Sequence, residues 1–169
     1  MRLIKRKKIV DPDIKVDLFS VFFSSGFFTG YAPAASGTVG SAFALLFYLI
    51  PGFLNPFISA SSILVCFTVG IFTSEKMIKR YGDDPSVVVI DEIVGMWITV
   101  FIAGFLSFGY PTIIIGFFMF RLFDIIKLYP ASFFDKVKNG FGIMMDDVIA
   151  GVYGGFSTII ILLVIKYFY

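Results

Sequence analysis

Residues 87–98 read VVVIDEIVGMWI, and within them Asp91 and Glu92 interrupt a run that is otherwise apolar. An ionised carboxylate beside a lipid bilayer is costly unless it is paired, hydrated or bound to a cation. Beyond the N-terminal region, nearly every carboxylate belongs to one of three patches that adjoin long apolar stretches: Asp83, Asp84, Asp91 and Glu92; Asp124 and Asp135; Asp146 and Asp147. This placement indicates a metal site or an ion path.

The composition is that of an integral membrane protein. Of the 169 residues, 58% are hydrophobic and 15% are charged, and the mean hydropathy is +0.93. Soluble domains are only about 45–50% apolar. We therefore expect residues 1–169 to form a single membrane-embedded domain. The net charge of only +2 gives no indication of a nucleic-acid partner.

The residue types that the chain lacks restrict its chemistry. It has no histidine, which excludes a histidine nucleophile, general base or metal ligand. Its single cysteine, Cys66, lies in an apolar run and is expected to be a buried, small hydrophobic residue. Carboxylates, hydroxyls and cationic side chains are the groups that remain for a catalytic site.

Five apolar runs follow a polar start. Residues 1–16 form a basic arm, and residues 18–29 are apolar but shorter than the roughly 20 residues that a membrane span needs. We expect an interfacial or re-entrant helix there. The later runs predict an all-α, polytopic membrane protein with about five membrane-embedded helices, at residues 39–57, 59–74, 87–108, 111–126 and 147–166.

The positions of lysine and arginine predict the orientation, because basic loops stay on the cytoplasmic side. The N-terminal arm would lie inside, as would the basic loops that follow the second and fourth spans. The same face then receives all three acidic patches and the glycine-rich loop of residues 30–41. We therefore expect the chemistry at the level of the cytoplasmic lipid headgroups.

The third span has a clear start signal. Asp84 before Pro85 is the pattern of an aspartate N-cap followed by a proline in the first helical turn, and Asp83 could serve as a cap too. If the helix begins near residue 85, Asp91 and Glu92 lie about 10 Å along it, where no cap explains them. Instead of binding a metal, these carboxylates could form an ion pair with a lysine.

Two further groups of residues suit phosphate or metal binding. Arg121, Asp124 and Lys127 are spaced by three residues and share a helix surface, either as a self-neutralising cluster or as a phosphate clamp around a metal ligand. In the loop of residues 30–41, Thr38 and Ser41 suit either an anion at a helix start or a helix cap.

The last apolar run opens with Asp146 and Asp147, one of which could merely cap the helix. Gly151 and Gly155 follow, four residues apart, and predict a face that packs closely against another helix. Such packing would bring Asp147 near the other acidic helices.

Together these residues predict a Mg²⁺ site and metal-assisted phosphoryl transfer at a membrane surface, because Mg²⁺ prefers oxygen ligands shared between carboxylates and a phosphate. The predicted catalytic, water-activating or metal-binding residues are Asp91, Glu92, Asp124 and Asp147, with Asp146 as a further metal ligand. The predicted phosphate-binding residues are Arg121, Lys127, Thr38 and Ser41.

These motifs resemble the phosphatidylglycerophosphatase A family over roughly residues 17–155. The family has a loop like G-x-x-P-x-x-P-G-T-x-G-S, a D-E-x-x-G-x-W-I segment and a long F-R-x-x-D-x-x-K-P-x-P…D…G-G-x-G-I-M-x-D-D-x-x-A-G stretch. Here they correspond to residues 30–41, 91–98 and 120–151. Ser36, Leu128 and Asn139 depart from the pattern, and none of them removes a charged group.

The resemblance implies hydrolysis of the membrane lipid phosphatidylglycerol phosphate to phosphatidylglycerol, dependence on Mg²⁺, and a bacterial cytoplasmic membrane. Two different functions use similar residues. A CDP-alcohol phosphotransferase should carry a D-G-x-x-A-R…G-x-x-x-D-x-x-x-D pattern, which the chain does not show. A small cation transporter should place its carboxylates near the middle of the bilayer and often has repeated halves.

Overall fold

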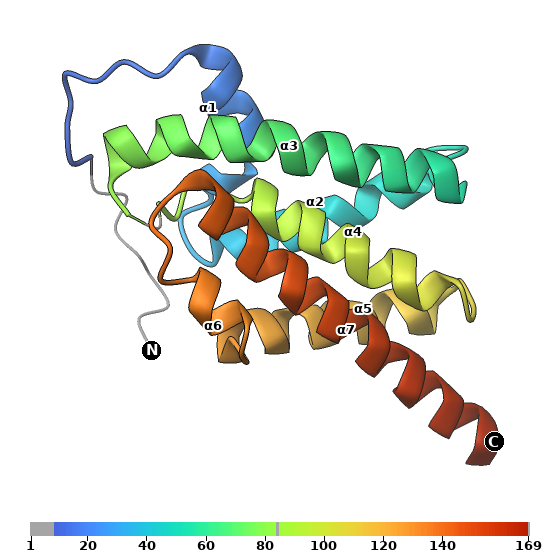
Figure 1. Cartoon of the computed structure of the whole chain (residues 1–169). Coiled ribbons are helices and arrows are strands. Elements are labelled where there is room, and N and C mark those ends of the chain that lie inside the picture. Colours follow the sequence, from blue (N-terminus) through green and yellow to red (C-terminus); the bar gives the residue numbers. More distant parts are fainter. Residues whose placement is uncertain (1–8, 84, 169) are drawn as a thin grey trace.

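The computed structural model describes residues 9–83 and 85–168, and within these residues all regular structure is helical (Figure 1). The all-α prediction is therefore confirmed. The elements are α1 (Leu18–Ser24), η1 (Thr29–Tyr31), α2 (Ser36–Leu46), η2 (Phe47–Leu49), α3 (Pro56–Tyr81), α4 (Ile90–Gly104), α5 (Tyr110–Ile126), α6 (Ala131–Phe134) and α7 (Gly140–Phe168), where η denotes a 3-10 helix.

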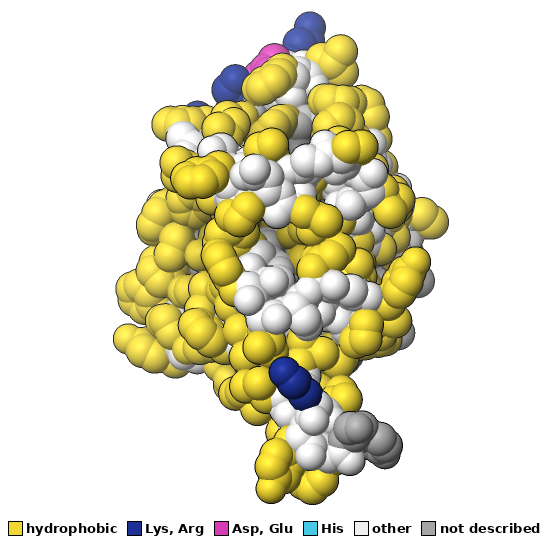
Figure 2. Space-filling view, turned by 90° about the vertical axis from the view of Figure 1, so that its right-hand side faces the viewer, with side chains coloured by type: hydrophobic (Ala, Val, Ile, Leu, Met, Phe, Trp, Pro, Cys, Tyr) yellow, Lys and Arg dark blue, Asp and Glu magenta, His cyan; other side chains and the backbone are white. Residues whose placement is uncertain are grey.

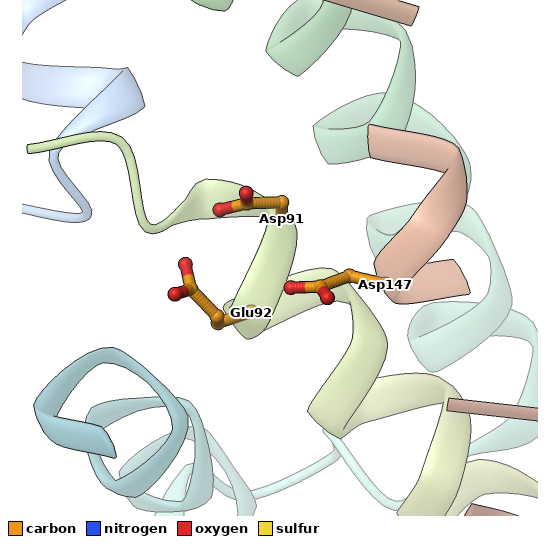
Figure 3. Close-up of side chains that lie close together, drawn as sticks. All are labelled: Asp91, Glu92 and Asp147. Carbon is orange, nitrogen blue, oxygen red and sulfur yellow. The ribbon is translucent and has the colours of Figure 1, made fainter. Parts of the chain in front are cut away.

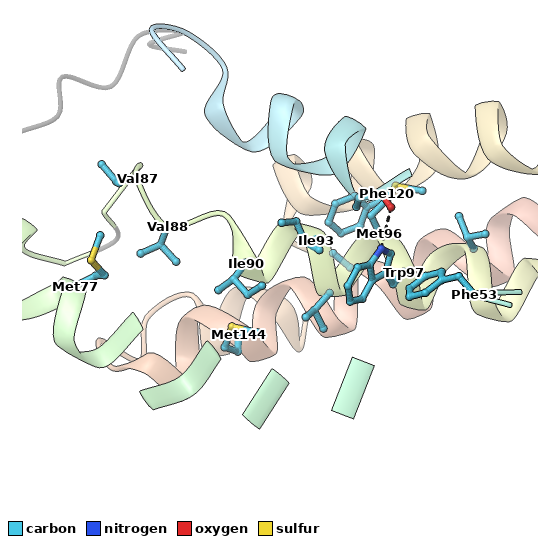
Figure 4. Close-up of a cluster of buried hydrophobic side chains, with 14 residues drawn as sticks. Phe53, Met77, Val87, Val88, Ile90, Ile93, Met96, Trp97, Phe120 and Met144 are labelled. Atoms are coloured by element: carbon cyan, nitrogen blue, oxygen red, sulfur yellow. Dashed lines mark hydrogen bonds between the residues drawn. The ribbon is translucent and has the colours of Figure 1, made fainter. Parts of the chain in front are cut away.

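Helix α4 forms the centre of the bundle and contacts α2, α3, α5 and α7. Its Ile93 and Met96 side chains are buried in the hydrophobic core (Figure 4), and so is Val94. Trp97 joins α4 to α2, because its indole N–H donates a hydrogen bond to the carbonyl oxygen of Ala44 at 2.9 Å. A helix that is apolar on most sides is expected in such a central position.

Helices α4 and α7 approach each other through glycines. A Cβ atom added to Gly151 would lie 2.5 Å from the carbonyl oxygen of Gly95, so no larger residue fits there without a shift. The Thr99 hydroxyl lies 3.0 Å from the carbonyl oxygens of both Gly95 and Gly151 and links the two helices. Gly155 lies against Ile102 of α4 in the same way. The predicted close-packing face is confirmed, and its partner is α4.

The start of α4 differs from the prediction. Residues 85–89 are not helical, and α4 begins at Ile90. The N–H of Val88 bonds to the carbonyl of Pro85 in a turn, and the N–H of Val89 donates to the carbonyl of Ser24, the last residue of α1. Because these tertiary bonds hold the segment away from helical geometry, Asp91 and Glu92 lie in the first turn of α4.

The start of α7 also differs. The helix begins at Gly140, so Asp146 and Asp147 lie inside it and neither is a cap. The Asn139 side chain accepts a hydrogen bond from the N–H of Gly142 at 2.8 Å. Glu75 of α3 accepts one from the N–H of Gly140 at 2.7 Å. These two acceptors satisfy N–H groups that a helix start leaves open, and they extend the helix upstream of the apolar run.

The predicted first span, residues 39–57, is not a single helix. Helix α2 begins at Ser36, ends at Leu46 and continues only as the short 3-10 helix η2. The chain then turns at Gly52, whose φ of +90° is a left-handed conformation that favours glycine. The predicted glycine-rich loop is correspondingly shorter, because residues 36–41 already belong to α2.

Within the described residues, α3 and α7 are the two helices that are long and apolar enough to cross a membrane. Only 22% and 28% of their most apolar windows are buried inside the protein, so most of each window lies on the outside. Apolar side chains cover the face in Figure 2, and the charged ones visible there lie near its two ends. The other apolar helices are shorter than 18 residues, and their length does not confirm about five spans.

Replacement of Gly151 by alanine tests the α4–α7 contact. We expect Gly151→Ala to lower the free energy of unfolding in detergent by about 1–3 kcal/mol, because its Cβ would push against the α4 backbone. Gly104→Ala is the matched control, since an added Cβ there meets no atom of the described residues within 4 Å. Equal stability of the two variants in denaturant unfolding would contradict the proposed tight contact.

Candidate active site

A cavity of about 590 Å³ opens at one end of the bundle, where α4 and α7 begin and α5 ends. Its lining comes from parts of the chain that are far apart in the sequence, which are residues 32–38, Ile78, Asp83, and residues within 85–92, 121–127 and 135–147. All three acidic patches contribute to this lining. The convergence of the motifs at one place, which their charge pattern predicts, is therefore confirmed.

Three carboxylates form the acidic centre of the cavity. Asp91 and Glu92 come from the first turn of α4, and Asp147 comes from α7 beside it (Figure 3). One oxygen atom from each lies within 4.8 Å of the others. Asp147 is 3% exposed. The three side chains are turned toward a shared space that one cation could fill.

The donor set of this trio fits a hard divalent cation. The Oε2 atom of Glu92 is buried and has no hydrogen-bond partner in the described part of the chain. Buried carboxylate oxygens normally have a partner, so this atom calls for a ligand. Carboxylate oxygens are the ligands that Mg²⁺ and Ca²⁺ prefer. The N-terminal position on α4 also stabilises the two negative charges through the helix dipole.

Arg121 supplies the cationic side of the cavity. Its Nη1 atom lies 2.8 Å from the Oδ2 atom of Asp124 and 3.4 Å from the Ser41 hydroxyl. Its Nε–H is buried and has no partner among the described residues. Asp124 and Ser41 therefore hold the guanidinium while one donor stays open. Arginine is suited to phosphate because its donors form a planar fork.

Lys127 takes a different position from the one predicted. It follows the last residue of α5 in a left-handed conformation with a φ of +51°, and its ion pairs among the described residues are with Asp135 and Asp146 and not with Asp124. Its ammonium lies 2.5 Å from Asp146 Oδ2 and also contacts Asp135. Partial burial alone would lower the pKa of Lys127, but Asp146 and Asp135 outweigh that effect and raise it, so the group stays charged.

The hydroxyls of α2 divide into two roles. Thr38 lines the cavity. Ser41 is fully buried, and its hydroxyl donates a hydrogen bond to the carbonyl oxygen of Gly37 at 2.8 Å. The same hydroxyl accepts a hydrogen bond from Arg121 and so helps to position the guanidinium. Gly37 is also close to the site, since a Cβ there would lie 2.1 Å from the Oε1 atom of Glu92.

Several residues at the site were not predicted to act there. Asp135 pairs with Lys127, and Asp83 pairs with Lys138 at 2.5 Å on the exposed rim of the cavity. The predicted capping role of Asp83 is therefore wrong, and Asp84 lies outside the described residues. The pKa of Lys138 is raised by its contact with Asp83. Glu75 of α3 accepts the hydrogen bond from the N–H of Gly140 at the start of α7, and no local sequence pattern marks this long-range contact.

The sequence model of the phosphatidylglycerophosphatase A family matches residues 22–164. The chain belongs to this family. All three motifs that indicated the resemblance contribute residues to the cavity. The structure thus joins the family motifs into one site.

The chain is similar to three curated relatives. It is 38% identical to a putative phosphatidylinositol-3-phosphatase of Bacteroides thetaiotaomicron, over 79% of this chain and 87% of the relative. It is 36% identical to phosphatidylglycerophosphatase A of Haemophilus influenzae, over 84% of this chain and 85% of the relative. It is 33% identical to phosphatidylglycerophosphatase A of Escherichia coli, over 89% of this chain and 87% of the relative. No solved structure gives a significant match.

Gly37→Ala tests the geometry of the acidic centre. The new methyl group would displace Glu92, and we expect the affinity for Mn²⁺ to fall about 10- to 100-fold, the range seen when the support of a metal ligand is lost. Helix stability should not fall, because alanine is a better helix former than glycine. Val39→Ala in the same turn is the control. Unchanged Mn²⁺ binding by Gly37→Ala, measured by electron paramagnetic resonance, would contradict this placement of Glu92.

Proposed function

We propose that this protein is a Mg²⁺-dependent membrane phosphatase of phospholipid biosynthesis. It hydrolyses the phosphate monoester of phosphatidylglycerol phosphate and releases phosphatidylglycerol and phosphate. The observation that carries the proposal is one cavity that holds both a carboxylate trio and Arg121, in which one buried oxygen of Glu92 and the Nε–H of Arg121 have no hydrogen-bond partner among the described residues. Membership of the phosphatidylglycerophosphatase A family supports the choice of reaction.

Asp91, Glu92 and Asp147 would hold the Mg²⁺ ion, and Asp124 lies in the same cavity as a further acidic group. When bound, Mg²⁺ polarises a phosphoryl group and lowers the pKa of a coordinated water. A compact trio of this kind matches the usual Mg²⁺ site, in which a few carboxylates share the ion with substrate phosphate and water.

The chain's own residues bind and orient the substrate. Arg121 is placed to receive phosphate oxygens through its open Nε–H, while Asp124 and Ser41 fix the guanidinium plane. A carboxylate of the trio accepts a proton from the attacking water. The water oxygen forms a bond to phosphorus, and the bond from phosphorus to the glycerol oxygen breaks. The carboxylate then returns the proton that it took from water to this leaving oxygen, which departs as the alcohol of phosphatidylglycerol.

A phosphoinositide is the second candidate substrate, because a relative named as a putative phosphatidylinositol-3-phosphatase is 38% identical to this chain. Both lipids present a phosphate monoester at the headgroup, and the trio and Arg121 would recognise that shared group. A phosphotransferase and a cation transporter are less well supported. Membership of a phosphatase family argues against the phosphotransferase, and carboxylates gathered at one end of the bundle argue against the transporter.

Phosphate release from the purified protein tests the proposed activity. We expect turnover of phosphatidylglycerol phosphate in detergent micelles, loss of turnover in EDTA and recovery with Mg²⁺. Asp147→Asn should lower kcat at least about 100-fold, whereas Asp83→Asn on the exposed rim should keep most of the rate. Faster hydrolysis of phosphatidylinositol 3-phosphate would change the substrate, and activity in excess chelator would refute the metal mechanism.

We further propose that the protein is a multi-pass protein of the bacterial cytoplasmic membrane, with about five embedded helices and the cavity facing the cytoplasm. The lengths of α3 and α7 support the membrane setting. The concentration of Arg121, Lys127 and Lys138 at the cavity end supports the orientation, since basic residues favour the cytoplasmic side. The lipid would then present its phosphate to the cavity without leaving the membrane.

Labelling of single cysteines tests this orientation. In a Cys66→Ser background, Lys136→Cys beside the cavity should react with a membrane-impermeant maleimide only after the cytoplasmic face is opened. Tyr110 is 84% exposed and begins α5 at the other end of the bundle, so Tyr110→Cys should react in intact cells. The reverse pattern would overturn the proposed orientation.

A further inference from the structure

Five of the carboxylates that line the cavity form two neighbouring groups. The first is the trio of Asp91, Glu92 and Asp147, with oxygen atoms within 4.8 Å of one another. The second is the pair of Asp135 and Asp146, which meet the ammonium of Lys127. Because Asp146 and Asp147 are adjacent on α7, the two groups adjoin each other.

This arrangement is comparable to that of two-metal phosphatases, in which acidic groups hold two ions about 3.5–4 Å apart. Here the second acidic pair already binds a positive charge, the ammonium of Lys127. Both oxygens of Asp146 are engaged by the protein, since Oδ2 lies 2.5 Å from Lys127 Nζ and Oδ1 accepts the N–H of Asp147 at 3.0 Å. Asp146 is only 7% exposed, which restricts the approach of another ion.

The backbone fixes Lys127 in this position. The residue has a φ of +51°, a backbone conformation that residues other than glycine rarely adopt. Its N–H donates a hydrogen bond to the carbonyl oxygen of Phe123 at 2.8 Å and closes the last turn of α5. A cation at the carboxyl end of a helix is also favoured by the helix dipole. The end of α5 therefore fixes where the Lys127 side chain begins, and the two acidic partners hold its ammonium.

We propose that the Lys127 ammonium takes the place of a second divalent cation, so that the active site holds a single metal ion. The inference rests on the proposed function, because it assumes that the trio binds the metal. In this arrangement Asp146, predicted above as a further metal ligand, is instead the partner of Lys127, and Asp147 remains in the trio that binds the metal. Lys127 acts as a positioning residue and as a fixed positive charge beside the phosphate.

The number of bound Mn²⁺ ions per protein tests the proposal. In equilibrium dialysis with elemental analysis, we expect one Mn²⁺ in the native protein and two in Lys127→Met, where the acidic pair is free. The second ion should produce spin coupling between adjacent Mn²⁺ ions in the electron paramagnetic resonance spectrum. Lys138→Met is the matched control, because it removes a cavity lysine that pairs with Asp83 on the rim, and it should still bind one ion.

Asp146→Asn gives an independent result if Lys127→Met does not fold, as judged by circular dichroism and gel filtration. The proposal expects one Mn²⁺ with less than about a tenfold change in affinity, since losses from residues that only support a metal ligand begin near that value. Two ions in the native protein, one ion in folded Lys127→Met, or loss of the ion in Asp146→Asn would each overturn it. No ion in the native protein would instead refute the metal site of the proposed function, and with it this inference.

Discussion

The close contact between α4 and α7 is the constraint on which the site depends. Gly95 and Gly151 let the two backbones meet, and the Thr99 hydroxyl links their carbonyl groups. Asp147 lies one turn before Gly151 on α7, and Asp91 lies one turn before Gly95 on α4. The contact that joins the helices therefore also sets the spacing of the carboxylates. A larger side chain at either glycine would push against the neighbouring helix and so change the spacing of these carboxylates.

The cavity contains several negative charges, and the helix ends around it stabilise them. Asp91 and Glu92 lie at the amino end of α4, where the helix dipole and open N–H groups favour anions. Lys127 lies at the carboxyl end of α5, where a cation is favoured. The opposite ends of two helices thus stabilise opposite charges in one cavity. The apolar surfaces of the bundle can then face lipid without a charged group at their centre.

The choice of residues at the site was largely predictable, because isolated charges in an apolar sequence stand out. Asp91, Glu92, Asp124, Asp147, Arg121, Lys127 and Thr38 all line the cavity. The helix starts were less predictable. Pro85 is a good helix-start signal, but the N–H of Val89 bonds to Ser24, which is 65 residues away in the chain (89 − 24). Similarly, Glu75 on α3 extends α7 upstream to Gly140. Such long-range partners leave no local pattern.

The sequence by itself determined the helical class, the apolar surfaces, the glycine face of α7 and the chemical types available for catalysis. These follow from composition and from periodicities of a few residues, which local sequence carries. The tertiary structure decided which charges pair with one another. In the folded protein Lys127 forms ion pairs with Asp135 and Asp146, and the Ser41 hydroxyl lies within hydrogen-bond distance of Arg121. Ion pairing depends on distances between helices that are remote in sequence, and only the packed bundle fixes those distances.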